Sequence, residues 1–213
     1  MKRFLIIVTI LLSMAVCGAL AHAESGSKVL LMPREGISND IDLMLTKEVG
    51  VMTSMLKKAG FEVVVVTVSG QPIVAPTTTL EPDLKLADVK VADYVGFIMP
   101  CMAVGLWPGP PVAPEAVAIV KQAVAEGKPV AAQLGSVIIL AEAGVLKGKQ
   151  YAFYEDPLSR DARFEGAIYS NDTIVKDGNI ITSCCCPNMA AMWGHPDGTA
   201  NLTQTLIAEL VRK

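Results

Sequence analysis

The sequence predicts a single doubly wound α/β domain with a mostly parallel central sheet. Short apolar segments alternate with helical segments along the chain, which is typical of a parallel sheet covered by helices on both faces. Residues 61–68, FEVVVVTV, are so rich in valine that they indicate a strand buried on both faces. No internal repeat or long linker divides the chain. One domain therefore accounts for the whole pattern.

The elements follow in order from the same patterns. Strands are expected at residues 29–32, 61–68, 94–99, 129–132, 151–154, 173–175 and 179–182. Helices are expected at residues 40–59, 115–125, 137–143 and 199–211. Apolar residues recur three or four positions apart in the first helix, and Gly60 suits its C-terminal cap. Residues 69–80, rich in Pro and Thr, and the Pro-rich residues 107–114 are expected to be loops.

The N-terminus has the pattern of a cleaved signal peptide. Lys2 and Arg3 precede an uncharged apolar run at residues 4–20, and Ala21-His22-Ala23 is a small-residue cleavage site. A lipoprotein modified at Cys17 and an uncleaved anchor are the weaker alternatives. Residues 1–23 are therefore interpreted as the signal and residues 24–213 as a periplasmic or secreted domain, without a stable membrane span after cleavage.

The composition of the mature chain excludes some partners. After removal of residues 1–23, 16 basic and 21 acidic side chains remain, a net charge of −5. This acidic balance argues against nucleic acid as a partner. Four cysteines and one histidine also remain. All four cysteines, Cys101 and Cys184 to Cys186, follow expected strands, and ligands of such sheets bind beyond the carboxyl ends of the strands.

Five segments carry a resemblance to a known family: KVLLMPREG, KKAGFEVVVVTVSG, ADYVGFIMP, EGKPVAAQLGSVIILAEAGVLKGK and GAIYSNDTIVKDGNIITS. In this order and spacing the chain resembles the ThiJ/PfpI family, the DJ-one-like proteins of the class I glutamine amidotransferase-like superfamily, from Lys28 to the C-terminus. The resemblance implies a flavodoxin-like three-layer sandwich, assembly into dimers or larger homo-oligomers, and glyoxalase, hydratase, deglycase or peptidase activity.

The resemblance also implies a nucleophilic cysteine in the turn after the fourth strand. That position falls on Leu134, between Gln133 and Gly135. A thiolate at a helix N-terminus is a strong nucleophile, whereas leucine neither ionises nor attacks. Ser136 lies two residues late and is a poor substitute. The chain therefore reads as a family member without the standard catalytic cysteine, a pseudoenzyme candidate.

Two further family positions can be placed. The acidic residue that bonds the family's thiol falls on Glu48, with Glu35, Asp40 or Asp42 as alternatives and a solvated surface glutamate as the plain interpretation. The family's P-G-G turn becomes Pro100-Cys101-Met102. Loss of both glycines is expected to narrow the approach of a substrate to that backbone.

The cysteine run Cys184-Cys185-Cys186 leaves several hypotheses open. A disulfide between Cys101 and one cysteine of the run is the first. A soft-metal site for an ion such as Cu(I) is the second, although the sequence requires no cofactor; its ligands would come from Cys184, Cys185, Cys186, Met189, Met192 and His195. Relocated nucleophilic catalysis by Cys101 or Cys185, with Glu48 as a further candidate, is the third. Inert packing is the fourth, and His195 is expected to be an exposed turn residue.

These observations predict a pocket at the strand carboxyl ends. Its expected lining is Glu48, Cys101, Met102, Gln133, Leu134, Gly135, Cys184, Cys185 and Cys186. The function favoured by the sequence is binding of a small-molecule ligand or soft metal, or redox chemistry of the thiols. The alternatives are a glyoxalase-, hydratase- or hydrolase-like enzyme with a relocated cysteine, and a structural or assembly domain.

Overall fold

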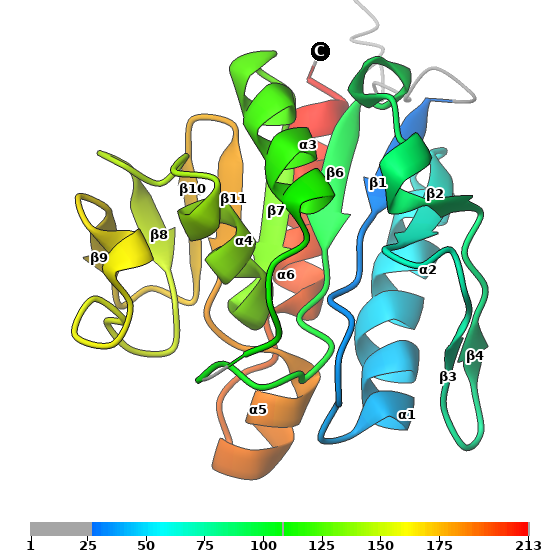
Figure 1. The fold of residues 1–213 in the computed structure, drawn as a ribbon, viewed down its shortest axis with the longest axis horizontal. Coiled ribbons are helices and arrows are strands. Elements are labelled where there is room, and N and C mark those ends of the chain that lie inside the picture. Colours follow the sequence, from blue (N-terminus) through cyan, green and yellow to red (C-terminus); the bar gives the residue numbers. More distant parts are fainter. Residues whose placement is uncertain (1–26, 108, 213) are drawn as a thin grey trace, which may run out of the picture.

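The computed structural model of the chain describes residues 27–107 and 109–212, and its centre is a seven-stranded sheet (Figure 1). The strand order is β10-β11-β7-β6-β1-β2-β5. Every neighbouring pair is parallel except β10 and β11. The strands are β1 (Lys28–Leu31), β2 (Glu62–Thr67), β5 (Leu84–Lys85), β6 (Gly96–Met99), β7 (Val130–Gln133), β10 (Ile174–Asp177) and β11 (Ile180–Ser183). The predicted doubly wound, mostly parallel α/β fold is confirmed.

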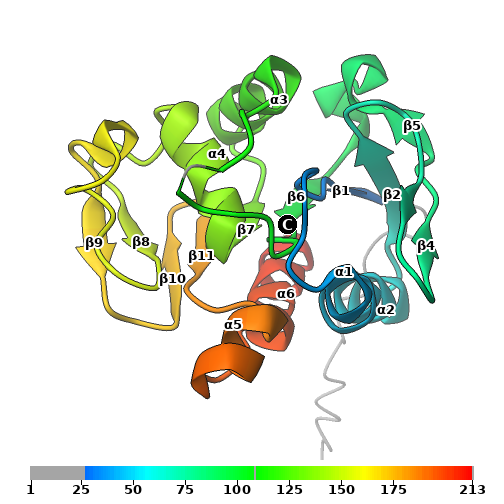
Figure 2. The same ribbon diagram turned by 60° about the horizontal axis from the view of Figure 1, so that its bottom comes forward.

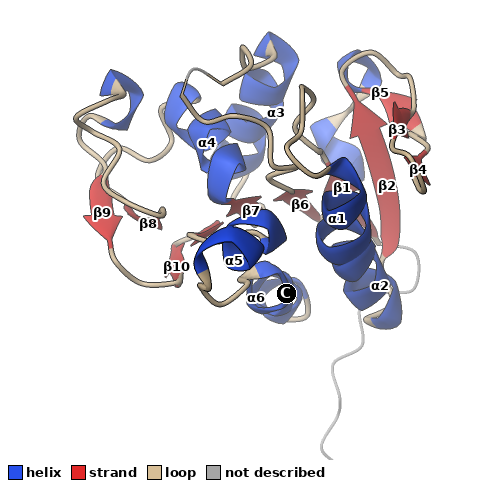
Figure 3. Cartoon of the chain, turned by 90° about the horizontal axis from the view of Figure 1, so that it is seen from below, coloured by secondary structure: helices blue, strands red, loops and turns tan. Residues whose placement is uncertain are grey.

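Helices cover both faces of this sheet (Figures 2 and 3). On one face lie α3 (Pro114–Ala125) and α4 (Val137–Glu142), and on the other α2 (Gly50–Lys58) and α6 (Thr199–Leu210). Each face has its own apolar core, because successive strand residues point to opposite sides. Val64 and Val66 of β2 pack on the α3 side, whereas Val63 and Val65 pack on the α2 side. This double burial explains the uninterrupted valine run.

The long N-terminal helix is not a uniform α-helix. It begins as α1 (Ile41–Leu43), continues as the π-helical segment η1 (Met44–Val49), and ends as α2. Asp40 caps its start by accepting a hydrogen bond from Leu43 N–H at 3.2 Å. Four of the six residues in η1 are buried, Glu48 among them. A single α-helix over residues 40–59 was the expectation, and apolar spacing alone does not reveal the wider turn.

Some small elements differ from the sequence expectation. The expected loop at residues 69–80 contains the hairpin strands β3 (Ile73–Val74) and β4 (Thr79–Leu80). Beyond β10, β8 (Gln150–Ala152) and β9 (Ile168–Ser170) pair as a separate parallel sheet. The short helix α5 (Pro187–Trp193) follows the cysteine run and begins with proline, which suits a first helical turn.

The predicted signal peptide at residues 1–23 lies outside the described residues. Within residues 27–107 and 109–212, no helix has both the length and the apolar character needed to cross a membrane.

Candidate thiol site at the strand carboxyl ends

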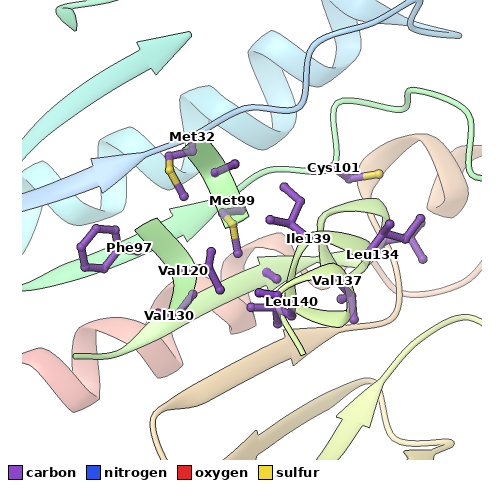
Figure 4. Packing of buried hydrophobic residues seen from close by; sticks show 14 of the residues in the cluster. Met32, Phe97, Met99, Cys101, Val120, Val130, Leu134, Val137, Ile139 and Leu140 are labelled. Atoms are coloured by element: carbon purple, nitrogen blue, oxygen red, sulfur yellow. The ribbon is translucent and has the colours of Figure 1, made fainter. Parts of the chain in front are cut away.

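The site lies where β6 and β7 end side by side. Strand β6 is paired with β7 in parallel register, so the turns that follow Met99 and Gln133 emerge at one edge of the sheet. Cys101 belongs to the first turn and Leu134 to the second. Figure 4 shows both side chains next to each other beyond the sheet, away from Phe97 and Val130 in the strands.

Hydrogen bonds to a buried carboxylate hold the backbone of the turn after β6 in place. Met102 and Ala103 have φ values of 63° and 52°, a region costly for residues with a side chain. The Glu48 carboxylate accepts hydrogen bonds from Cys101 N–H and Met102 N–H, both at 2.9 Å. The π-helical segment thus supplies an acceptor for two buried donors, which would otherwise be costly to leave unpaired. Glu48 is a fully buried structural partner of this turn.

The turn after β7 has a strained backbone between a strand and a helix. Leu134 has a φ of 35°, an uncommon value for any residue other than glycine. It joins β7 to the short 3-10 turn η4 (Leu134–Ser136) that leads into α4, the strand–turn–helix arrangement of nucleophile elbows. The side chain at this position is a buried leucine. Ser136 is also buried and donates its hydroxyl to the Pro100 carbonyl at 2.6 Å, so it links the two turns.

The sulfur of Cys101 lies against the second turn. A Cβ atom added to Gly135 would stand 3.1 Å from Cys101 Sγ and would clash with Arg34 Nη1. Glycine at 135 is therefore what allows the thiol and the guanidinium to approach this backbone. The pKa of the Cys101 thiol is lowered to about 7, first by a hydrogen bond from the Cys186 thiol and then by the charge of Arg34 and by the N–H groups of Gly135 and Ala103; burial opposes this shift.

Arg34 is the cation of the site. It is 7 % exposed, and its guanidinium donates to the carbonyls of Val104 at 3.2 Å and Gly105 at 3.3 Å. Burial lowers its pKa, whereas the charge of Cys101 raises it. Among the described residues, no carboxylate forms a salt bridge with Arg34 within 4.0 Å. Because a buried unpaired charge is costly, the Cys101 thiolate and Arg34 stabilise each other's ionised forms.

The electrostatics distinguish Cys101 from its neighbours. Burial raises the pKa of Cys185 to about 12 and also raises that of Cys184. The pKa of Cys186 is raised because its thiol donates to Cys101. Burial, together with the charge of Cys101, raises the pKa of Glu48 against the lowering effect of its two N–H donors. Only Cys101 among the four thiols therefore combines burial with a favoured thiolate.

A pocket of about 170 Å³ opens onto the thiol. Cys101 and Cys186 line it together with two methionines, Met189 and Met192, so that four sulfur-bearing side chains share one small space. Leu134 forms part of the wall, and Met192 and Trp193 are exposed at 58 % and 55 %. The other lining residues are Asn39, Ala103, Val104, Gly105, Leu106 and Asn188.

The structure brings only some of the predicted pocket residues together. Cys101, Leu134 and Cys186 line the pocket. Glu48 is not a lining residue, but it accepts a hydrogen bond from Cys101 N–H. Met102 is buried in the core on the α2 and α6 side. Gln133 is fully buried; its amide donates to Cys185 O and, at 3.4 Å, to Thr199 Oγ1, while its Oε1 has no partner.

The predicted metal ligands also divide into two groups. Cys186, Met189 and Met192 line the pocket, whereas Cys184, Cys185 and His195 do not. All four cysteines in the described part of the chain are free thiols, so the structure does not contain the expected disulfide. His195 is exposed, as expected. Within the described part of the chain, no three or more His, Cys, Asp or Glu side chains are grouped to hold a metal ion. A metal at this site would therefore depend on methionine sulfur.

The alternative acids have other roles. Asp40 caps the first helix, and Asp42 accepts bonds from Thr77 N–H at 3.0 Å and from Thr77 Oγ1 at 2.7 Å. Glu35 accepts bonds from Val68 N–H and Ser69. Arg34 is the functional residue that the sequence reasoning missed. Its signal was its position two residues beyond the first strand, at the same edge that marked the cysteines.

Comparisons with known proteins identify the family and agree with the fold. The model of the DJ-1/PfpI family matches residues 40–194. An uncharacterized protein of Archaeoglobus fulgidus is 37% identical over 105 residues, which are 49% of this chain and 60% of that relative. The uncharacterized protein MJ0967 of Methanocaldococcus jannaschii is 28% identical over 207 residues, 91% of this chain and 94% of that protein.

A solved structure shows the same fold at low identity. The two-domain protein of Anabaena variabilis, which contains DJ-1/ThiJ/PfpI-like and ferritin-like domains, superposes with a TM-score of 0.64 at 21% identity. The match covers 86% of this chain and 48% of that protein, so this chain spans about half of its length. The fold and the strand–turn–helix site define a flavodoxin-like α/β domain. This chain belongs to the DJ-1/PfpI family.

Proposed function

We propose that this domain performs redox chemistry with a dithiol formed by Cys101 and Cys186, in a family member whose elbow position holds Leu134 in place of the standard cysteine. The observation that carries the proposal is that Cys101 and Cys186 line one small pocket, in which the Cys186 thiol is the largest cause of the lowered Cys101 pKa. A low-pKa thiol next to a second thiol in one pocket is the arrangement that dithiol–disulfide exchange requires.

The reaction balances with a small disulfide as the oxidant. The Cys101 thiolate attacks one sulfur of the substrate disulfide and releases the first thiol. The Cys186 sulfur then attacks Cys101, releases the second thiol and forms the Cys101–Cys186 disulfide. Two electrons pass from the two cysteines to the substrate, which leaves as two thiols. Arg34 and the N–H groups of Gly135 and Ala103 hold Cys101 in its reactive form.

The test is peptide mapping after equilibration in a glutathione redox buffer. The proposal expects a Cys101–Cys186 bridge that is lost in Cys186→Ser. The double variant C184S/C185S is the matched control, because it removes two thiols from the same run and should retain the bridge. Four free thiols in fully oxidised buffer, or a bridge through Cys184 or Cys185, would contradict the proposal.

Soft-metal binding is the second candidate, and the sulfur-rich lining of the pocket favours it. Two cysteines and two methionines suit Cu(I). Competition against a chromophoric Cu(I) chelator tests this candidate with the reduced protein. Tight binding that weakens in both Cys101→Ser and Met192→Leu would support it, and binding that neither change affects would exclude this pocket. A carbonyl enzyme is less favoured, because no histidine or carboxylate is among the described lining residues.

Export and oligomerisation complete the proposal. An exported domain would meet the oxidising conditions in which disulfide exchange operates. N-terminal sequencing of the protein from its native compartment should begin at Glu24; a retained Met1 would contradict cleavage. Light scattering of the purified domain should give at least a dimer mass, in line with the family resemblance.

A further inference from the structure

A second hollow, about 310 Å³ in volume, shares Leu106 with the lining of the thiol pocket. Its basic lining comes from three arginines, Arg34 near the start of the domain and the neighbouring Arg160 and Arg163. We propose that this hollow binds a small organic carboxylate, recognised by the guanidinium groups and by the apolar surface beside them. The inference does not depend on the proposed dithiol chemistry.

Arg34 is the buried end of this site. It is the only lining arginine that makes no salt bridge among the described residues. Arg34 and Arg163 line the same hollow, and the charge of Arg163 adds to the lowering of the Arg34 pKa by burial. Guanidinium groups that converge in a partly closed space create a positive field, which favours an anion.

The acidic residues near the hollow are already engaged. Asp161 is the one carboxylate among the described lining residues, and both of its oxygens accept bonds from the Arg163 side chain. Glu142 accepts a further bond from Arg163 at 3.1 Å, and Glu155 pairs with Arg160 at 3.1 Å. These bonds fix the orientation of Arg163. They leave the buried Arg34 without a carboxylate of its own.

The remaining walls indicate an organic anion. Leu106, Trp107, Pro110, Pro111 and Ile138 provide an apolar and partly aromatic lining. The Trp107 indole is fixed in place, because its Nε1–H donates to Tyr154 at 3.3 Å. A ligand with a carboxylate at one end and a flat apolar body fits both kinds of wall. A bare inorganic anion would use only the arginines.

Arg34 also connects this hollow to Cys101. A Cβ on Gly135 would clash with its Nη1 and would stand 3.1 Å from Cys101 Sγ, whereas a Cβ on Gly109 would stand 3.0 Å from its Nη2. One guanidinium therefore faces both spaces. A carboxylate bound in the hollow would share the positive charge that stabilises the Cys101 thiolate, and would raise the pH at which that thiolate forms.

The experiment titrates the reduced protein with benzoate and, as a neutral analogue of the same shape, benzamide, by calorimetry. We expect millimolar binding of benzoate and at least tenfold weaker binding of benzamide and of inorganic phosphate. Arg160→Gln should weaken benzoate binding about fivefold, the effect of losing one partly exposed charge contact. Arg212→Gln, two residues beyond the end of α6 and outside the lining of the hollow, is the matched control and should leave binding unchanged.

A second measurement tests the role of Arg34 in the unmodified protein, because a substitution of this buried residue could prevent folding. Saturating benzoate should raise the midpoint pH of Cys101 alkylation in the unmodified protein, and benzamide should not. Equal affinity for benzoate and benzamide, or unchanged binding in Arg160→Gln together with an unmoved alkylation midpoint, would overturn the site. Loss of dithiol exchange alone would not, because calorimetry detects binding without any reaction at Cys101.

Discussion

The turns after β6 and β7 lie side by side, and each has one feature of a nucleophilic site. One has the backbone conformation, and the other has the thiol. The β7 turn has the elbow backbone, with Leu134 at a φ of 35°, and an inert side chain. The β6 turn has Cys101, whose sulfur reaches across to the N–H of Gly135. Backbone N–H groups therefore stabilise the thiolate that lies near them, even when its cysteine belongs to another turn.

The largest expected effect distinguishes the two turns directly. Cys101→Ala should lower the rate of rapid iodoacetamide labelling at pH 7 by more than tenfold, because the other three thiols have raised pKa values. Leu134→Ala is the paired control and should retain the rapid phase. Mass spectrometry of the labelled peptides measures both. If rapid labelling persists in Cys101→Ala, the reactive thiol lies elsewhere.

The next effect concerns Gly135, a residue of the β7 turn that lies against Cys101 of the β6 turn. Gly135→Ala would place a Cβ against Arg34 Nη1 and 3.1 Å from Cys101 Sγ. We expect a loss of about 2 kcal/mol in the free energy of unfolding, the usual cost of overpacking, and slower labelling of Cys101. Urea denaturation measures the loss. Gly127→Ala has no neighbour within 4 Å of the added Cβ but places alanine at a φ of 71°, so it gives the cost of backbone strain without overpacking, for comparison.

A smaller effect should follow from removing the thiol of Cys186, the residue directly before α5. The pKa of Cys101 is held down chiefly by the Cys186 thiol, so Cys186→Ala should move the midpoint of the labelling rate from about 7 towards the usual value for cysteine. Cys185→Ala should leave the midpoint in place, since Cys185 does not line the pocket. If the wild type, Cys186→Ala and Cys185→Ala all share one midpoint, the Cys186 thiol does not set the pKa of Cys101.

The smallest effect concerns Glu48, which supports the β6 turn alone. At acidic pH the protonated Glu48 and the amide of Glu48→Gln each offer one carbonyl acceptor, so the two proteins should differ there by less than about 1 kcal/mol in the free energy of unfolding. The folded-state pKa of Glu48 is raised, so its contribution is complete below the unfolded pKa and declines as pH rises through the folded pKa. The wild type should therefore lose stability relative to the variant as pH rises. Urea titrations at several pH values measure this difference, and a constant difference would contradict the raised pKa.

Much of this arrangement could be predicted from the sequence. Strand and helix alternation predicted the sheet, and the strand ends predicted that Cys101 and Leu134 would meet. The family resemblance placed Glu48 near this site, and the structure shows that its carboxylate accepts bonds from the N–H groups of Cys101 and Met102. The roles within the cysteine run were beyond reach, because three consecutive cysteines give no indication of which one faces Cys101. Arg34 was missed because burial of a loop arginine depends on carbonyls of residues 104 and 105, far away in the sequence.

The π-helical segment η1 has a consequence for how this site tolerates change. A π-turn holds one residue more than the α-turn it replaces. Glu48 belongs to this segment, and its carboxylate bonds the N–H groups of Cys101 and Met102. A deletion that restored regular α geometry would rotate η1 relative to α2 and turn Glu48 with it. The inserted residue therefore sets the direction in which the helix offers its carboxylate to the β6 turn.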